Sequence, residues 1–344
     1  MTKQPTIYEE RRRKLKLNIL EDLYNLRALT TEQLSRRYKY SLSHIRRIVR
    51  ELRAEQSVIS EKVKGYKRIN RQQGNYHRIS TKGIRRLNQA DFVTSRTADQ
   101  LRVSEYYLGY VLSVNDLVIN LEPKGWKVIS GRDIKDKLSL NRADNIHGML
   151  ISPEGIKYGI YIFLNTVTEY NMKKIKSEIQ RHTNIPNMLF LTKNKSSFNQ
   201  VVEEFDASID IVKYPTFGVL PFAFGINYLI FMYTQENLMN FLKDYDVTPY
   251  PDADISAAPM GLKTVVIHEN EEKYFVNMLN NNLAMLSTIR SYRKERYELD
   301  GRKVLVATNM GEVIPDLLKD IHHVEYLHIA HAEMTDYFRN YAIN

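Results

Sequence analysis

Apolar side chains recur at helical spacing through the first part of the chain. Between residues 9 and 25 this spacing predicts an amphipathic helix. Thr30 and Gln33 have the spacing of a capping box, which predicts a short second helix. Ser41 is the expected N-cap of a third helix that runs to about Glu55. Three helices with a tight second turn are typical of a helix-turn-helix.

The third predicted helix has two different faces. Ile45, Ile48, Val49 and Leu52 share one face, which is expected to pack against the first two helices. The opposite face carries Ser43, His44, Arg46, Arg47, Arg50 and Arg53. In a helix lying in the major groove, the first four of these would reach base edges, and the later arginines would reach phosphates. The alternative is an ordinary solvated helix face, but no acid precedes Glu51 in this helix to pair with the arginines.

The segment after the third helix reads as a β-hairpin followed by a helix. Strands are predicted over residues 58–63 and 75–79, with a basic, turn-rich tip between them. Ser80 or Thr81 is expected to cap the closing helix. The tip residues that would contact the DNA backbone are Lys64, Tyr66, Lys67, Arg68 and Arg71. Residues 1–90 are therefore predicted to form a winged helix-turn-helix that binds double-stranded DNA.

Charge is distributed unevenly between this segment and the rest of the chain. Residues 1–90 contain 23 Lys and Arg against 8 Asp and Glu, a formal charge of +15. The other 254 residues contain 27 against 32, a formal charge of −5. A basic domain of this kind attracts the phosphate backbone of nucleic acid, although charge alone does not distinguish it from a solvated basic surface.

The remaining residues predict α/β structure. After a polar linker over residues 91–99, a helix is expected at 106–121, then strands at 125–129, 146–151 and 158–164, a helix at 171–182 and a strand at 188–192. This order, assigned to a domain over residues 100–213, is compatible with a nuclease-like core of the PD-(D/E)xK type. A C-terminal α/β region over 214–344 is expected to hold a long helix at 275–297, strands at 303–307 and 324–328, and a helix near 313–319. That region is a candidate for dimerisation or partner binding. The fold class is thus a multi-domain mixture of α+β and α/β parts.

Several short motifs resemble the replication-relaxation family of plasmids and other mobile elements. They are Leu29-Thr30-Thr31-Glu32-Gln33-Leu34, Ser113 to Leu121, Gly125-Trp126, Arg142-Ala143-Asp144 and Leu164 to Glu169. The resemblance covers roughly residues 15–195. It implies a winged helix followed by a core similar to a restriction endonuclease, with a role in plasmid replication or mobilisation.

Two enzymatic readings compete with simple DNA binding. A metal-dependent nuclease needs carboxylates on two neighbouring strands to hold Mg²⁺. Asp144 can supply the first, but Phe163 and Asn165 stand where family members tend to have acids. A relaxase would use a tyrosine nucleophile and a metal held by histidines. The only concentration of histidines is His322, His323, His328 and His331, which lacks the His-hydrophobe-His spacing.

We therefore predict a sequence-specific DNA-binding protein of a plasmid, conjugative element or phage, acting in replication, mobilisation or transcriptional control. It is expected to be a cytoplasmic homodimer without a cofactor or a catalytic site of its own, and a relaxase or a replication protein is the partner class to consider. The absence of cysteine excludes disulfides and thiolate zinc sites, and no signal peptide is expected. A DNA-nicking relaxase or a metal-dependent nuclease is the alternative.

Overall fold

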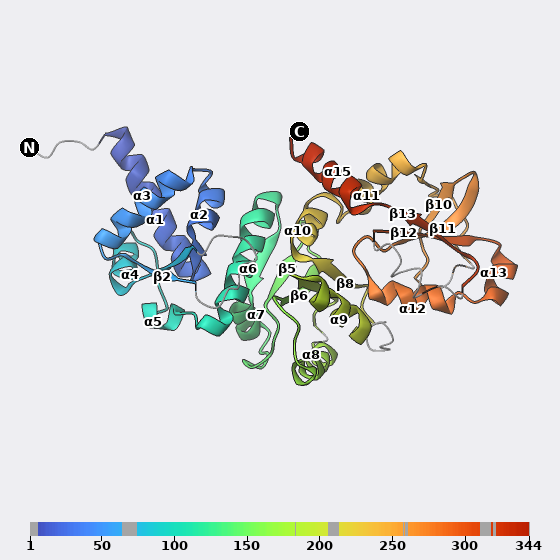
Figure 1. The fold of residues 1–344 in the computed structure, drawn as a ribbon, viewed down its shortest axis with the longest axis horizontal. Coiled ribbons are helices and arrows are strands. Elements are labelled where there is room, and N and C mark those ends of the chain that lie inside the picture. Colours follow the sequence, from blue (N-terminus) through green and yellow to red (C-terminus); the bar gives the residue numbers. More distant parts are fainter. Residues whose placement is uncertain are drawn as a thin grey trace, which may run out of the picture. The chain divides into compact units, whose positions relative to one another are not determined.

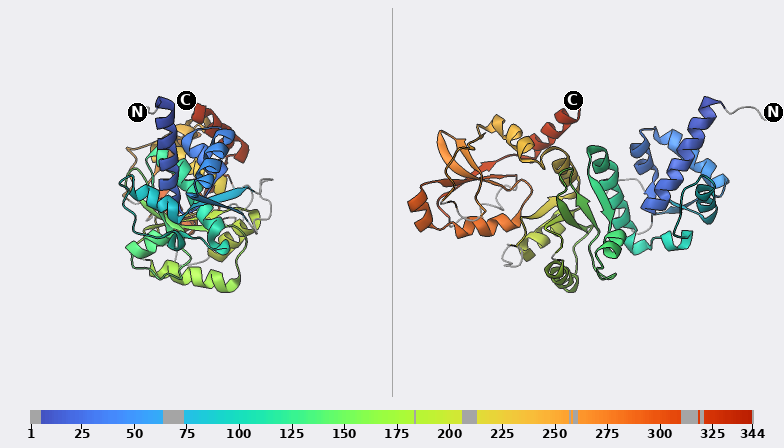
Figure 2. Two further views of the ribbon diagram at one scale, coloured as in Figure 1. Left: turned by 90° about the vertical axis from the view of Figure 1, so that its left-hand side faces the viewer. Right: turned by 180° about the vertical axis from the view of Figure 1, so that it is seen from behind.

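The chain forms two compact units in a computed structural model that describes residues 6–63, 74–182, 184–205, 213–256, 258, 261–309, 318 and 321–343. The first unit spans Met1–Pro123 and the second spans Lys124–Asn344. Helices and strands occur in both, and the described strands form three sheets (Figures 1 and 2). The mixed α and β, multi-domain class predicted from the sequence is confirmed.

The first unit begins with the helices α1 (Ile7–Leu26), α2 (Thr31–Tyr38) and α3 (Leu42–Ala54). The Thr30 hydroxyl accepts a hydrogen bond from the Gln33 backbone N–H at 3.1 Å, and the Gln33 side chain accepts one from the Thr30 N–H at 3.0 Å. This capping box satisfies N–H groups that the start of a helix leaves without an intrahelical partner. Ser41 caps α3 in the same manner, by accepting from the His44 N–H at 3.3 Å. The predicted second and third helices are confirmed.

A small antiparallel sheet and a fourth helix follow. The sheet has the order β1-β3-β2, with β1 (Leu29–Thr30), β2 (Val58–Lys62) and β3 (Asn75–Ile79). Ser80 precedes α4 (Thr81–Asn88) and caps it by accepting from the Gly83 N–H at 3.0 Å. A Cβ atom on Gly83 would lie 2.3 Å from the Ser57 carbonyl oxygen, so glycine allows α4 to approach the start of β2 closely. The predicted hairpin strands and closing helix are therefore present.

Two further helices, α5 (Ala98–Leu101) and α6 (Glu105–Leu121), complete the first unit. The Asn115 side chain of α6 donates to the Leu26 carbonyl at 3.1 Å. The Gln33 side chain of α2 donates to the Leu112 carbonyl at 2.7 Å. Ala98, Leu101 and Ile119 belong to the same hydrophobic core as α1 to α4. The first unit thus continues through the segment expected as a linker over residues 91–99 and includes the helix expected to begin the second domain.

The second unit contains a five-stranded sheet with the order β4-β5-β6-β7-β8. The strands are β4 (Lys127–Ser130), β5 (Gly148–Ile151), β6 (Lys157–Phe163), β7 (Asn187–Thr192) and β8 (Thr216–Pro221). β4, β5 and β6 pair antiparallel, whereas β6, β7 and β8 pair parallel. The helices between these strands are α7 (Gly131–Lys137), α8 (Glu169–Arg181) and α9 (Lys195–Phe205). The strands predicted between residues 125 and 192 are confirmed, and β8 adds one from beyond residue 214.

A second sheet of this unit has the order β13-β12-β11-β10-β9. Its strands are β9 (Thr248–Pro249), β10 (Val265–His268), β11 (Glu271–Asn277), β12 (Lys303–Thr308) and β13 (Val324–His328). The longer helices of this half are α10 (Phe222–Phe231), α11 (Gln235–Leu242), α12 (Leu283–Ser291), α13 (Lys294–Asp300) and α15 (His331–Ile343). Short 3₁₀ turns occur at Glu122–Lys124 and Lys243–Tyr245. The strands predicted at 303–307 and 324–328 are confirmed, and the helix predicted near 313–319 lies almost entirely outside the described residues.

The single long helix predicted over residues 275–297 is wrong. Its first part is β11, in which Tyr274 pairs with Val304 and Val276 pairs with Val306. β11 lies inside the sheet, between β10 and β12, and residues 273–276 are all buried. A continuous apolar run does not distinguish such a strand from a buried helix. Helical structure begins only at Leu283.

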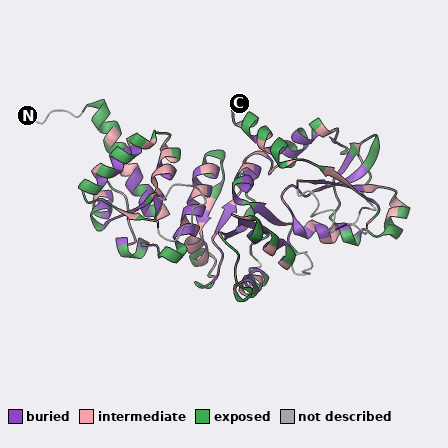
Figure 3. Cartoon of the chain, viewed as in Figure 1, coloured by how far each residue is buried: buried purple, intermediate pink, exposed green. Residues whose placement is uncertain are grey.

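An asparagine segment joins the two large sheets. The Val219 N–H of β8 donates to the Asn280 carbonyl at 3.2 Å, and the Asn281 side chain donates to the Val219 carbonyl at 2.8 Å. The Asn282 side chain accepts from the Phe217 N–H at 2.8 Å and donates to the Pro215 carbonyl at 3.1 Å. One hydrophobic core contains residues of both sheets, and buried residues occur in the strands of each (Figure 3). The structure therefore shows no boundary at residues 213 and 214.

The uncharged segment from Tyr214 to Gln235 forms β8 and α10, whose side chains are largely buried. Among the residues described, no helix combines the length and the apolar character needed to cross a membrane.

Candidate nucleic-acid interface

Helix α3 separates an apolar face from a basic one. Ile45, Ile48, Val49 and Leu52 are buried against the other helices of the first unit, as predicted. Because these residues fix the rotation of the helix, the opposite face points into solvent. Arg46, Arg47, Arg50 and Arg53 are exposed on this face together with Ser43, whereas His44 is half-buried. The structure thus brings together the six helix residues predicted from the sequence.

Most of these arginines carry charge that no acidic side chain among the described residues neutralises. Arg46, Arg50 and Arg53 make no ion pair or hydrogen bond with any residue that the structure describes. Arg47 contacts two neutral groups, the Tyr8 hydroxyl at 3.2 Å and His44 Nδ1 at 3.3 Å. An exposed guanidinium with free N–H donors is suited to bind phosphate oxygens or the acceptor edges of bases.

Glu51 of α3 and Glu55, which follows the helix, are paired with basic residues of α1 instead. Arg12 Nε donates to the Glu51 carboxylate at 3.0 Å, and Lys16 Nζ lies 2.9 Å from Glu51 and 2.6 Å from Glu55. Arg86 of α4 also pairs with Glu55. Partial burial would raise the pKa of Glu51, but Arg12 and Lys16 outweigh it and lower that pKa. Because these carboxylates are held on the α1 side, they leave the outward arginines unopposed.

Glu61 of β2 is bonded to two side chains of the neighbouring strand β3. Tyr76 donates to the Glu61 carboxylate, and Arg78 pairs with the same carboxylate at 2.8 Å. Lys62 is exposed at the end of β2. The predicted tip residues Lys64, Tyr66, Lys67, Arg68 and Arg71 lie outside the described residues, so their contacts stay predictions.

His77 is a buried histidine that the sequence did not single out. On β3 its Nε2 lies 3.0 Å from the Thr31 hydroxyl and its Nδ1 lies 2.8 Å from the Ser60 hydroxyl. Burial, assisted by the positive charge of Arg53, lowers the pKa of His77 to about 4. The neutral ring therefore connects β2, β3 and the start of α2, and its partners are 17 and 46 residues away in sequence. The only sequence signal was the position of a polar residue inside a predicted strand.

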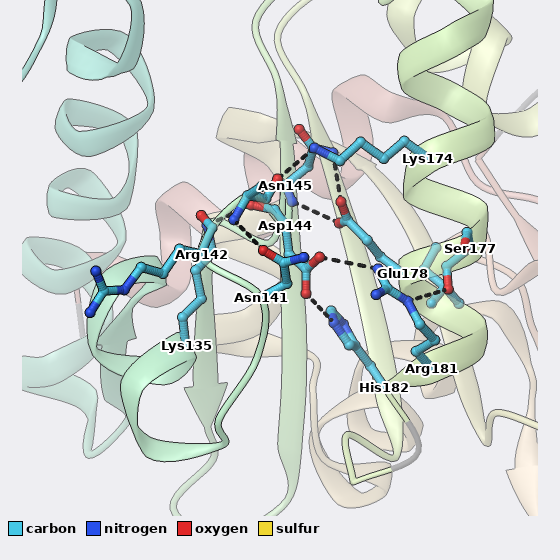
Figure 4. Close-up of polar contacts among 12 residues, drawn as sticks. Lys135, Asn141, Arg142, Asp144, Asn145, Lys174, Ser177, Glu178, Arg181 and His182 are labelled. Carbon is cyan, nitrogen blue, oxygen red and sulfur yellow. Dashed lines mark hydrogen bonds and ion pairs between the residues drawn. The ribbon is translucent and has the colours of Figure 1, made fainter.

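The candidate nuclease residue Asp144 lies in a different kind of site. Asp144 is buried, and its two carboxylate oxygens lie 3.1 Å from Arg181 Nη2 and 3.1 Å from His182 Nε2 (Figure 4). His182 Nδ1 is in turn 3.4 Å from the hydroxyl of Tyr161, which is fully buried. Burial raises the pKa of Tyr161 well above its ordinary value. This carboxylate is occupied by side chains of the protein.

The surrounding loop is fixed to α8 by the same cluster (Figure 4). The Glu178 carboxylate accepts from the backbone N–H and the side-chain amide of Asn145, both at 2.7 Å. Burial raises the pKa of Glu178, and the nearby Asp144 adds to the rise. Lys174 donates to the Ala143 carbonyl at 2.6 Å. These contacts hold the loop before β5 in place. Glu178 and Lys174 are therefore bonded to the protein itself and need no substrate to explain their presence.

The positions expected to complete a nuclease site hold no carboxylate. Phe163 packs in the hydrophobic core at the end of β6, and Asn165 is exposed. Within the described part of the chain, one group of three residues has metal-ligand spacing, formed by His268, Glu269 and Glu325. Lys273 Nζ lies 2.6 Å from Glu325, 3.2 Å from Glu269 and 3.3 Å from His268 Nδ1. The ammonium group already occupies the place where a cation would bind.

The C-terminal histidines lie on different elements of the fold. His323 is buried against the Tyr297 ring, and its Nε2 contacts the Tyr292 carbonyl. His328 ends β13 and His331 begins α15. His328 and His331 therefore do not lie on one helix.

Comparison of the chain with protein-family models, with curated proteins and with solved structures finds no significant match in any of the three. The resemblance to the replication-relaxation family remains an interpretation of short motifs. The function is therefore inferred from the residues of this chain.

Proposed function

We propose that the chain binds double-stranded DNA in a sequence-specific manner through a winged helix-turn-helix. In this proposal α3 is the recognition helix, α2 crosses the DNA backbone, and β2 and β3 are the strands of the wing. The observation that carries the proposal is the outward face of α3, where Arg46, Arg50 and Arg53 have no acidic partner in the described structure.

Each part of this face has a proposed role. The N-terminal turns of a recognition helix approach base edges, so Ser43, His44, Arg46 and Arg47 are the base-reading residues. Arg50 and Arg53, further along α3, bind phosphates and add affinity that does not depend on sequence. Neutralising phosphates releases counterions, and binding should therefore weaken as the salt concentration rises.

The predicted wing residues Lys64, Tyr66, Lys67, Arg68 and Arg71 add contacts to the backbone beside the major groove. A homodimer on two half-sites is the proposed assembly, because helix-turn-helix proteins commonly bind repeated sites with matching symmetry. The motif resemblance supports a role in replication, mobilisation or transcriptional control of a plasmid, conjugative element or phage. The nuclease-like region is proposed to act as a scaffold for self-association or for a relaxase or replication protein.

Selection of bound sequences from a random duplex pool provides the first test, followed by fluorescence anisotropy on the selected site. Arg46→Ala should weaken binding to that site by about 1 to 3 kcal/mol and relax the preference at one position. Arg50→Ala should weaken binding to all sequences and reduce the slope of log affinity against log salt by about 1.

Arg296→Ala is the matched control, since Arg296 is exposed on α13 and its loss changes the net charge equally. Equal losses for Arg46→Ala and Arg296→Ala would overturn the proposal, because they would indicate a general charge effect. Incubation of the protein with supercoiled DNA and Mg²⁺ tests the nuclease alternative. If the wild-type chain nicks the DNA and the folded Asp144→Ala variant does not, the proposed lack of catalysis is contradicted.

A further inference from the structure

Four side chains form a connected row at the N-terminal end of α3. Arg47 Nη2 lies 3.2 Å from the Tyr8 hydroxyl and 3.3 Å from His44 Nδ1. The His44 ring stacks on Tyr40 with centroids 4.7 Å apart and planes at 18°. Tyr8 comes from the first turn of α1, and Tyr40 comes from the turn between α2 and α3. The row therefore connects three parts of the first unit on one exposed surface.

We propose that Tyr8 and Tyr40 are specificity-determining positioning residues, which hold Arg47 and His44 in the arrangement that reads one base pair. This inference rests on the proposed function and specifies how part of the recognition face works. Tyr8 would act through its hydroxyl, as an acceptor for Arg47. Tyr40 would act through its ring, as a support for His44.

The contacts restrain Arg47 without cancelling its charge. Arg12 on α1 is paired with the Glu51 carboxylate, whereas Arg47 is held by a hydroxyl and an imidazole nitrogen, both neutral acceptors. Both contacts use Nη2, so the donors on Nη1 and Nε remain available to a ligand. Acceptance by His44 Nδ1 also places the proton of a neutral imidazole on Nε2, which leaves the ring one N–H donor.

Restraint before binding favours recognition on entropic grounds. A free arginine side chain loses rotamer freedom when it is fixed against a base, and that loss opposes binding. A side chain already held by two neighbours loses less. The exposed fractions of Tyr8 and Tyr40 are 54% and 45%. Neither residue is part of the hydrophobic core, so core packing does not explain why an aromatic residue stands at either position.

The test is a double-mutant cycle measured by anisotropy in the full chain on the selected duplex. Tyr8→Phe should weaken binding about 3- to 10-fold and relax the preference at the same base pair as Arg47→Ala. In the Arg47→Ala background, Tyr8→Phe should have no further effect. An additive effect would identify Tyr8 as a direct DNA contact and would overturn its positioning role, as would unchanged affinity of the single variant.

Tyr40 is tested by separating its ring from its hydroxyl. Tyr40→Phe should bind like the wild-type chain, whereas Tyr40→Leu should weaken binding about threefold with the same relaxed preference. A loss with Tyr40→Phe equal to that with Tyr40→Leu would overturn the role of the ring. Tyr106→Phe is the control, since Tyr106 is 69% exposed on α6 of the same unit. If the wild-type chain selects no sequence, the proposed function fails before the cycle begins, which distinguishes the two failures.

Discussion

The outward face of α3 and the Asp144 cluster contain similar chemical groups in opposite situations. On α3, Arg46 and Arg50 are exposed without an acidic partner in the described structure. Around Asp144, the buried carboxylate is matched by Arg181 and His182. The first arrangement contributes little to folding and leaves its charge for a ligand, whereas the second fixes a loop and leaves none. Availability of a charged group, more than its type, therefore separates the candidate interface from the candidate nuclease residue.

The largest expected effect concerns the scaffold that presents α3. Removal of residues 91–344 should abolish cooperative unfolding of the N-terminal part, because α5 and α6 supply core residues such as Leu101 and Ile119. Each buried side chain of this size contributes about 2 kcal/mol, against a total domain stability of about 5 to 15 kcal/mol. Circular dichroism melting of fragments 1–90 and 1–123 checks this. Only the longer fragment should melt cooperatively, and identical melting of the two would contradict the prediction.

The second effect tests the internal use of Asp144. Asp144→Ala should destabilise the second unit by about 3 kcal/mol, because the buried His182 ring loses its carboxylate partner, whereas the half-exposed Arg181 can turn to solvent. DNA affinity of the folded variant should stay unchanged. Urea unfolding provides the measurement, with Asp252→Ala as the control at an exposed aspartate. A variant as stable as the wild type would show that the cluster does not stabilise the fold.

The third effect concerns pH and the sheet behind α3. The pKa of His77 is about 4 in the fold, below its ordinary value of 6.5, so the unfolded chain binds a proton more readily. Stability from this group is therefore complete above pH 6.5 and decreases as the pH falls toward 4, by on the order of 3 kcal/mol. Unfolding of His77→Gln over this range should depend less steeply on pH. Parallel curves for the two proteins would contradict the assignment.

The smallest effect concerns the ion-paired carboxylate of Glu51 on α3 and its influence on DNA binding. Glu51→Gln releases Arg12 from its carboxylate partner and leaves Lys16 with Glu55 alone. Binding to any DNA sequence at low salt should then rise roughly twofold to threefold, with a steeper dependence on salt. Anisotropy on the selected site and on an unrelated duplex measures both changes. A gain limited to the selected site would indicate a base contact instead.

Local patterns predicted much of the first unit. The capping box at Thr30 and Gln33, the cap at Ser41 and the apolar face of α3 are encoded within a few residues. They determined which residues of α3 face solvent, and the structure agrees. The wing tip remains a prediction, since residues 64–73 are not among those described.

The features that the sequence did not predict depend on contacts between distant residues. Tyr8 meets Arg47 across 39 residues, and Asn115 of α6 meets the Leu26 carbonyl across 89 residues. Residues 273–276 match a buried strand and a buried helix equally well until the neighbouring strands are known. Local periodicity carries no information about such partners.

The asparagine segment Asn280–Asn282 limits how the second unit can associate with other chains in solution. β8 is the last strand of its sheet, and an open strand edge offers N–H and C=O groups on which another chain can add. The backbone groups of Pro215, Phe217 and Val219 are instead taken by the asparagines. The segment thus protects this edge from intermolecular strand addition. Because Asn280–Asn282 lie between β11 and α12, the edge of one sheet is protected only when the other half of the second unit is present.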